Sequence, residues 1–203
     1  MGTLTSVCVY CGSGTGINPA HEAAARILGR DLGRAGIRLI YGGGSIGLMG
    51  AVARATLEAG GQVTGIIPKF LQSRERPMQE LTELVVTEDM HQRKMLMFER
   101  ADAFVALPGG IGTLEELVEQ MTWAQLGRHQ KPVLLANIDR FWEPFISLLD
   151  AMRRERFIRS ELEVTCLVAK DAKDIVPMLQ RAAGARRQAE LEKTAAAEPL
   201  SRM

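Results

Sequence analysis

The sequence has few of the residues that mark several classes of protein. Its 203 residues include three cysteines, and aromatic residues make up 5% of the chain. A small, odd cysteine count excludes a scaffold built on disulfides. Few aromatics argue against a surface that stacks nucleic-acid bases. Lys and Arg number 25 and Asp and Glu number 24, so the formal net charge is +1 and gives no excess positive charge for nucleic acid or a membrane surface.

Long apolar runs are also missing. No stretch approaches the ~18 uninterrupted apolar residues that a membrane-spanning helix needs. Residues Met1 to Tyr10 have neither a basic region nor a long apolar region followed by a cleavage site, so they do not resemble a secretory signal. We therefore expect a cytoplasmic protein that binds neither nucleic acid nor a membrane.

Apolar segments typical of strands alternate with segments of helical periodicity. Strands separated by helices of this length indicate βαβ units, and nearly continuous apolar strands indicate a parallel sheet covered on both faces. The sequence therefore predicts an α/β fold, a doubly wound, Rossmann-like parallel sheet in a single domain. Strands are expected at residues 4–10, 38–41, 63–67, 84–87, 103–107, 133–136 and 164–169, and helices at 18–35, 46–59, 89–100, 113–126, 141–154 and 172–183.

The last part of the chain differs from the rest. Residues 1–183 carry the alternating pattern, whereas 184–203 are rich in Ala, Arg and Glu, lack a clear apolar stripe and contain Pro199. We expect this tail to extend the last helix before becoming disordered.

Glycine is abundant, with 20 residues, above the usual ~7%. Much of the excess lies in three clusters, Cys11–Gly16, Gly42–Gly50 and Pro108–Thr113, each of which follows a predicted strand. Glycine lets the backbone turn tightly and lets a ligand approach closely, and the N-terminus of the following helix suits a phosphate. The three loops predict a phosphorylated, nucleotide-like ligand, and the first is the one most readily explained as purely structural.

Common phosphate-binding signatures fit poorly. Gly42, Gly44 and Gly47 have the dinucleotide spacing, but no acidic residue ends the predicted strand at 63–67 to bind a ribose hydroxyl. No Gly-Lys-Ser/Thr follows any of the loops. Neither bound NAD nor a P-loop ATPase is therefore expected.

Charged residues near these loops are candidates for chemistry. Glu116 lies about one turn into the helix that follows the third loop, where its carboxylate would be close to a bound phosphate or sugar. Arg93 and Lys94 place two adjacent cations on the preceding helix. Both features can also occur without a catalytic role, since Glu is common in the first turn of a helix and basic pairs are common on solvated helix faces. Cys8 and Cys11 lack a second ligand pair for zinc, and we expect them to be structural.

Two motifs resemble those of a known family. Pro108 to Glu116 matches the pattern PGGxGTxxE of the Lonely Guy family, the cytokinin riboside 5′-monophosphate phosphoribohydrolases, long labelled lysine decarboxylases. Met90 to Lys94 matches the family's second motif, a Met followed three residues later by Arg-Lys. The similarity covers roughly Ser6 to Val168, and it also takes in Tyr41–Gly50, Met121–Gly127 and Lys131–Val133.

The resemblance implies hydrolysis of the N-glycosidic bond of an N6-substituted adenosine 5′-monophosphate, or of plain AMP. It assigns catalysis to Arg93 and Glu116 and requires no metal or cofactor. It also implies a homodimer, with assembly into a hexamer left open by the sequence, and we expect the helix at 113–126, with Trp123, to pack against the second subunit. Together with the glycine loops, it leads us to expect substrate binding by Glu75, Lys94, Gly109, Gly110, Ile111, Gly112, Thr113, Leu114, Glu115, Thr122, Gly43 and Gly44.

The chemistry is consistent with this assignment. Cleavage of a nucleoside's C1′–N bond passes through an oxocarbenium-like state that a carboxylate can stabilise. An arginine remains protonated, so Arg93 would clamp the substrate rather than donate a proton. The alternative is a carrier of related fold that holds a nucleotide or a pterin-like cofactor without hydrolysis, and such a protein would not need both Arg93 and Glu116. A pyridoxal-phosphate lysine decarboxylase is disfavoured because no Schiff-base lysine stands out.

Overall fold

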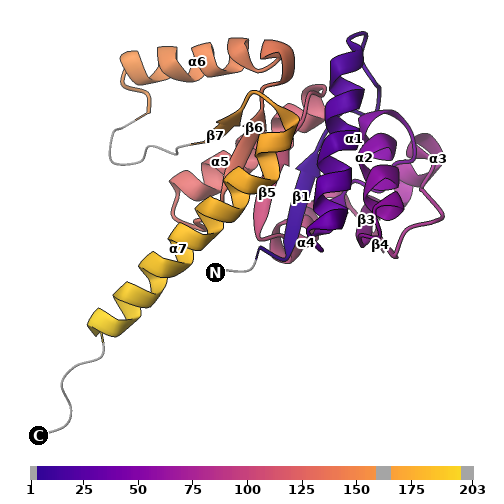
Figure 1. Ribbon diagram of the computed structural model, residues 1–203. Coiled ribbons are helices and arrows are strands. Elements are labelled where there is room, and N and C mark those ends of the chain that lie inside the picture. The colour runs from indigo at the N-terminus through magenta and orange to yellow at the C-terminus, as the bar shows by residue number, and fades with distance from the viewer. Residues whose placement is uncertain (1–3, 159–165, 198–203) are drawn as a thin grey trace, which may run out of the picture.

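A single parallel sheet of seven strands forms the centre of the molecule (Figure 1). The computed structural model describes residues 4–158 and 166–197. The strand order is β4-β3-β2-β1-β5-β6-β7, and every neighbouring pair is parallel, which confirms the predicted α/β fold. The strands are β1 Ser6–Tyr10, β2 Arg38–Tyr41, β3 Val63–Pro68, β4 Glu83–Thr87, β5 Ala103–Ala106, β6 Val133–Ala136 and β7 Leu167–Ala169.

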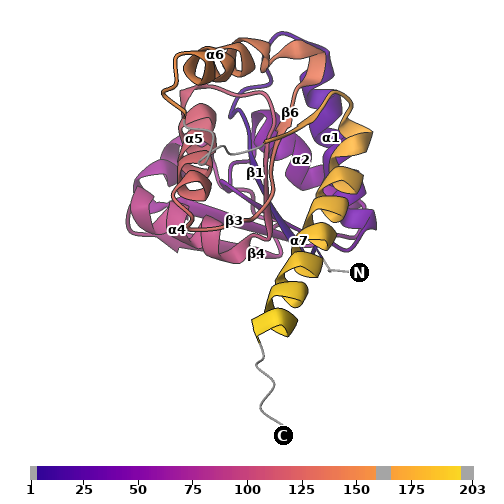
Figure 2. The same cartoon turned by 90° about the vertical axis from the view of Figure 1, so that its left-hand side faces the viewer.

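Helices cover both faces of the sheet (Figure 2). On one face α1, α2 and α7 pack against side chains such as Val7 and Val9. On the other, α4, α5 and α6 meet the alternate side chains Cys8 and Tyr10 of the same strand. The helices are α1 Pro19–Arg34, α2 Gly47–Glu58, α3 Gln72–Glu75, α4 Met90–Arg100, α5 Ile111–Gln125, α6 Glu143–Arg154 and α7 Ile175–Ala197, with short 3₁₀ turns η1 Lys69–Leu71, η2 Ile138–Arg140 and η4 Ala172–Asp174.

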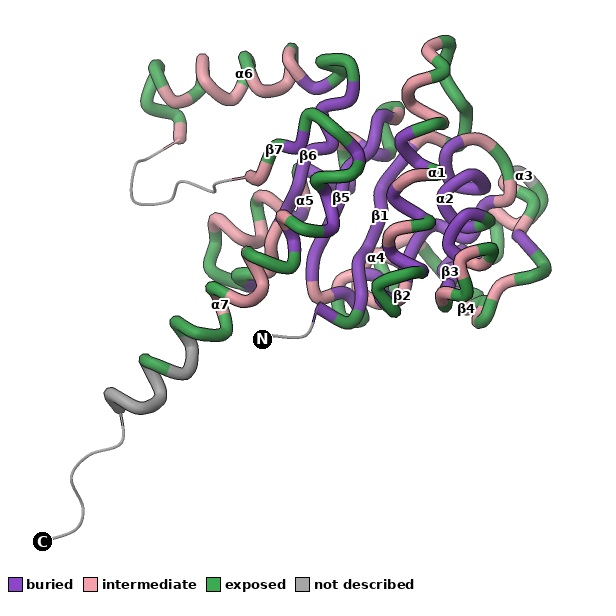
Figure 3. Tube along the Cα trace, viewed as in Figure 1, coloured by how far each residue is buried: buried purple, intermediate pink, exposed green. Residues whose placement is uncertain are grey.

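The central strands are buried over their whole length (Figure 3). All residues of β1, β5 and β6 are buried, whereas the edge strand β4 alternates and exposes Leu84 and Val86. This is why the central strands read as continuous apolar runs in the sequence.

Most expected elements occur, with shifts at several ends. The last helix runs from Ile175 to Ala197 and follows the 3₁₀ turn η4, so it is much longer than the expected 172–183 and includes most of the expected tail. Figures 1 and 2 both show α7 projecting away from the sheet. Part of the strand expected at 164–169 and the last six residues of the tail lie outside the described residues. The short elements at 69–75 had no counterpart in the sequence prediction.

The strand order reverses between β1 and β5. The chain winds outward from β1 to β4 and then returns past β1 to β5, so the loops after these two neighbouring strands diverge. In such sheets ligands bind in the crevice at this switch point, outside the carboxyl ends of the strands. Within residues 4–158 and 166–197, no helix has both the length and the apolar character that crossing a membrane requires.

The packing of α1 against α2 depends on glycine. A Cβ on Gly29 would lie 2.3 Å from the carbonyl oxygen of Val52 and 2.9 Å from the Cβ of Ala55. Both contacts are too short for real atoms, and the first involves rigid backbone. The absence of a side chain therefore sets how closely the two helices approach.

We expect Gly29→Ala to lower the free energy of unfolding by about 1–3 kcal/mol because it overpacks this contact. The gain in helix propensity, up to about 1 kcal/mol, does not offset that cost. The matched control is Gly184→Ala in α7, where nothing lies within 4 Å of the added Cβ, and which we expect to stabilise slightly. Urea unfolding measures both, and equal stability of the two variants would contradict the packing argument.

Candidate active site

The three glycine loops meet at the switch point. The Gly12 N–H donates to the Pro108 carbonyl at 3.1 Å, and the Gly12 carbonyl accepts from the Leu48 N–H at 3.1 Å. One residue of the first loop therefore joins the second loop to the third. Cys11, Gly12 and Ser13 also line the cavity described below, so the first loop contributes to the site as well as to its framework.

Two positions in these loops require glycine because other backbone or side-chain atoms lie so close to them. A Cβ on Gly109 would lie 2.1 Å from the Thr113 hydroxyl oxygen. Gly47 has a φ of +61°, and a Cβ there would lie 2.2 Å from the Ser13 carbonyl oxygen. The left-handed conformation and the close contact both exclude a larger residue at this point.

The loops border a cavity of about 270 Å³. It lies at the carboxyl ends of β1 and β2, between α4 and the N-terminus of α5. Apolar side chains line part of the cavity, and Glu75, Arg93 and Glu116 contribute charged groups. Its lining comprises Val9, Tyr10, Cys11, Gly12, Ser13, Gly42, Met49, Glu75, Arg93, Met97, Gly110, Ile111, Gly112, Thr113 and Glu116.

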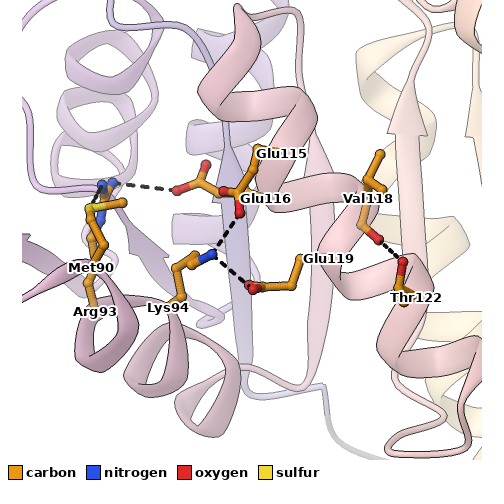
Figure 4. Close-up of polar contacts among 8 residues, drawn as sticks. All are labelled: Met90, Arg93, Lys94, Glu115, Glu116, Val118, Glu119 and Thr122. Atoms are coloured by element: carbon orange, nitrogen blue, oxygen red, sulfur yellow. Dashed lines mark hydrogen bonds and ion pairs between the residues drawn. The ribbon is translucent and has the colours of Figure 1, made fainter.

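Arg93 and Glu116 face each other in this cavity (Figure 4). Arg93 Nη2 lies 3.6 Å from Glu116 Oε1, and the two residues are 6% and 9% exposed. Gly42 makes room for the guanidinium, since a Cβ there would lie 2.4 Å from Arg93 Nη2. Among the described residues Arg93 Nε has no hydrogen-bond partner. The pair is therefore buried and not fully bonded, which leaves both groups able to contact a ligand.

Helical spacing brings the pair together. Asp89 caps α4, where its carboxylate accepts from the Gln92 N–H at 2.8 Å. Arg93 and Met97, four residues apart, are the buried face of that helix. Glu116 lies one turn into α5, with Thr113 and Gln120 on the same buried side. The cavity therefore receives one charged residue from each helix.

The Glu116 carboxyl has a strongly shifted pKa. Burial raises the pKa from 4.5 to about 7, because the charged form loses its hydration. Arg93 is the main opposing influence, while the neighbouring charges of Glu115 and Glu75 raise the pKa further. Near neutral pH this carboxyl exists in both forms, so it can accept a proton and return it.

The N-terminus of α5 forms the other wall. Gly110 is its N-cap and makes no side-chain cap hydrogen bond, and Ile111, Gly112 and Thr113 form the first turn beside the cavity. The first N–H groups of a helix have no acceptor within the helix and carry partial positive charge. This wall is therefore suited to an anion such as a phosphate.

Glu75 reaches the cavity from a separate segment. Its Oε2 is buried and has no hydrogen-bond partner among the described residues. The segment is held by the second glycine loop, because the Gly43 carbonyl accepts from the Met78 N–H at 3.2 Å and Gly44 forms an antiparallel bridge with Pro77. Gly43 and Gly44 do not line the cavity; they fix the segment that carries Glu75.

Five other expected binding residues lie away from this cavity. Lys94 and Glu115 are bonded to each other, and the Thr122 hydroxyl donates to the Val118 carbonyl at 2.8 Å. Leu114 packs against the apolar core beneath α5. Gly109 borders a neighbouring cavity of about 290 Å³ that also contains His21 and Phe141.

The sequence prediction missed several lining residues. Tyr10 and Cys11 stand where β1 ends, and Met49 lies in the first turn of α2. Met97 lies four residues after Arg93, a spacing that could have placed it in the site. Burial raises the pKa of the Cys8 and Cys11 thiols, which keeps both protonated, in agreement with a structural role. His91 is exposed on α4.

The fold and the site together define a Rossmann-like nucleotide-binding protein. The sheet is doubly wound and parallel, and its switch point carries glycine loops, a helix N-terminus suited to an anion and a buried Arg–Glu pair. The family model described as "Possible lysine decarboxylase" matches residues 49–179. The chain is 48% identical over 174 residues to the protein named cytokinin riboside 5′-monophosphate phosphoribohydrolase LOG of Oryza sativa subsp. japonica, a match that covers 86% of this chain and 72% of that protein. It is 46% identical over 174 residues to the protein of the same name, LOG7, of Arabidopsis thaliana, over 86% and 80% of the two chains.

The chain therefore belongs to the family of cytokinin riboside 5′-monophosphate phosphoribohydrolases, as its motifs predicted. Solved structures agree on the fold. The Moco carrier protein of Chlamydomonas reinhardtii superimposes with a TM-score of 0.69 at 21% identity, over 90% of this chain and 99% of that one. The molybdenum cofactor binding protein of Rippkaea orientalis gives 0.65 at 19% identity, over 88% and 97%.

We expect the Glu116 carboxyl to titrate near pH 7 in the free protein, followed by NMR of ¹³C-glutamate-labelled protein and assigned with Glu116→Gln. Arg93→Gln removes the cation that favours the charged form, so it raises the midpoint. Glu115→Gln removes a like charge, so it lowers the midpoint. A Glu116 midpoint near 4.5 in the wild type would contradict its burial as the main influence.

Proposed function

We propose that this protein hydrolyses the N-glycosidic bond of adenosine 5′-monophosphates, either N6-substituted or plain AMP, and releases the free base and ribose 5-phosphate. The observation that carries the proposal is the buried Arg93–Glu116 pair, which faces a cavity beside the N-terminus of α5. The names of relatives at 45–48% identity support the same reaction.

In this proposal the substrate's 5′-phosphate lies against the first turn of α5. Backbone N–H groups between Gly110 and Thr113 and the helix dipole would bind it without a dedicated basic side chain. This agrees with the net charge of +1. The phosphate then fixes the ribose near Glu116, which lies one turn further along the same helix.

Glu116 would act at the sugar carbon. Its carboxylate stabilises the positive charge that develops at C1′ as the C1′–N bond breaks. A water molecule adds to C1′; Glu116 takes one of its protons, and the departing base gains a proton at the ring nitrogen that loses the sugar. A pKa of about 7 lets one carboxyl serve as acceptor and then as donor near neutral pH.

Arg93 would bind and orient the substrate. Its guanidinium remains charged at all relevant pH values, so it donates hydrogen bonds and does not transfer protons. Its Nε has no hydrogen-bond partner among the described residues, and its Nη2 faces Glu116 at 3.6 Å. Glu75, whose buried Oε2 also has no partner within the described part of the chain, would accept from a ribose hydroxyl or an amino group of the base.

We also propose that the protein forms a homodimer through the outer face of α5. Val118 and Leu126 are 41% and 75% exposed, and Ile111, which also borders the cavity, is 82% exposed. Their spacing places all three on one side of the helix. Trp123 lies elsewhere: its ring meets that of Phe98 edge-on, with centroids 5.0 Å apart. The apolar stripe, rather than Trp123, would form the contact with a second copy.

Glu116→Ala should reduce turnover of AMP and isopentenyl-AMP by about 10²–10³-fold, because it removes the charge that stabilises the transition state. Release of base is followed by chromatography, with dAMP, GMP and CMP completing the panel. The matched control is Glu88→Ala, an exposed carboxylate paired with Lys69 away from the cavity. Wild-type turnover in Glu116→Ala would refute the assignment, and nucleotide bound but left intact by the wild type would favour a carrier.

Val118→Glu should convert the dimer to a 22.2 kDa monomer, because it places a charge at the centre of the apolar stripe. Light scattering coupled to gel filtration measures the mass. Ile17→Glu is the control, since Ile17 is fully exposed on the first glycine loop and away from α5. A monomeric wild type would refute the proposed dimer.

A further inference from the structure

Lys94 follows Arg93 on α4, but its side chain has a different environment. Its Nζ lies 2.7 Å from Glu115 Oε1 and 2.9 Å from Glu119 Oε1, both on α5 (Figure 4). The Lys94 and Glu119 side chains are 15% and 21% exposed, and that of Glu115 is 50% exposed. One ammonium group thus bridges two carboxylates that are one helical turn apart.

This bridge lies outside the cavity. None of Lys94, Glu115 and Glu119 is among the residues that line it. The ammonium group is bonded to two carboxylates, and those hydrogen bonds raise its pKa despite partial burial, so it stays charged. The geometry therefore does not present Lys94 to a phosphate or sugar in the cavity.

The bridge ties together the same two helices that carry the catalytic candidates. Lys94 is adjacent to Arg93, and Glu115 is adjacent to Glu116. The Arg93–Glu116 separation of 3.6 Å is longer than a hydrogen bond, so this pair does not fix its own geometry. Further along, the two helices meet through apolar side chains, with the rings of Phe98 and Trp123 edge-on and their centroids 5.0 Å apart. Beside the cavity, the two short bonds of Lys94 join α4 to α5.

We propose that Lys94 is a positioning residue: by clamping Glu115 and Glu119, it holds α5 at the distance from α4 that places Glu116 opposite Arg93. The proposal rests on the hydrolase function proposed above. It differs from the substrate contact that the family resemblance suggested for Lys94.

Two physical arguments favour a clamp at this place. Partly buried charges are screened less by salt than exposed ones, so the bridge remains effective in physiological buffer. Loss of Lys94 would also leave two carboxylates, Glu115 and Glu119, with no cation between them and next to Glu116. Like-charge repulsion would then act on the helix that carries Glu116 and also disfavour its charged form.

Lys94→Met tests the clamp through the split between kcat and KM. We expect kcat for AMP to fall about 10–100-fold, because a small misplacement of a reacting group has effects of this size. KM and inhibition by ribose 5-phosphate should stay within about twofold, since the phosphate site on α5 is retained. Lys94→Arg, which keeps the charge and can reach both carboxylates, should recover most of the lost kcat.

Glu119→Gln provides an independent variant, because Glu119 does not line the cavity. It should lower kcat in the same way, and the double variant Lys94→Met/Glu119→Gln should be no worse than Lys94→Met alone, as expected for one shared interaction. Arg100→Met is the matched control. It removes an ion pair with Glu83 at 2.8 Å at the C-terminal end of the same helix, two turns beyond Arg93, and should leave kcat unchanged.

Two results would overturn the proposal. One is a raised KM and weaker ribose 5-phosphate inhibition in Lys94→Met with kcat intact, which would make Lys94 a substrate ligand. The other is an unchanged Glu116 midpoint in the NMR titration of Lys94→Met, since loss of the clamp should raise it. Because the titration needs no turnover, it tests Lys94 even if the wild type cleaves no nucleotide, a result that would refute only the proposed hydrolase function.

Discussion

The structure of the site depends on the burial of one carboxylate, that of Glu116, opposite one guanidinium. Removing a carboxylate from water costs several kcal/mol, and a nearby cation offsets only part of that cost. The result is a carboxyl with a pKa of about 7 at the switch point of the sheet. The surrounding glycines serve this arrangement: Gly42 leaves room for the guanidinium of Arg93, and Gly109 lets the third loop lie against the first.

The site is divided among elements with different tasks. The sheet supplies a rigid edge, α5 supplies both the anion-binding turn and Glu116, and α4 supplies Arg93 and the clamp from Lys94. Backbone hydrogen bonds through Gly12 keep the loops in register. Because neighbouring residues on one helix do different work, adjacent positions such as Arg93 and Lys94 need not share a role. In the proposed mechanism, Arg93 faces the cavity and binds the substrate, and Lys94 holds α5 at the required distance from α4.

Much of this could be predicted from the sequence, for physical reasons. Apolar runs and helical periodicity depend on local spacing, so the sheet was foreseen from the residues. The pairing of Arg93 with Glu116 was implied by the family motifs, and the structure places the two side chains 3.6 Å apart. The roles of Gly43 and Gly44 were not foreseen. Their contacts with residues 77 and 78 form only when that later segment folds back onto the second glycine loop. The partners of Lys94 lie 21 and 25 residues away, and motif spacing carries no information on such pairing. The tail was expected to extend the last helix, but the length of that extension was not foreseen, because its later turns lack an apolar stripe.

The attachment of Glu75 has a consequence for which positions of its segment are free to vary. The segment that carries Glu75 is fastened to the second glycine loop through main-chain atoms of Gly43, Gly44, Pro77 and Met78. Main-chain fastening does not depend on which side chains the exposed residues Gln79 and Glu80 carry. Substitutions at these two exposed positions can therefore accumulate while the Glu75 carboxylate keeps its place in the cavity. One short segment thus combines positions that are free to vary with one that the main chain holds in place.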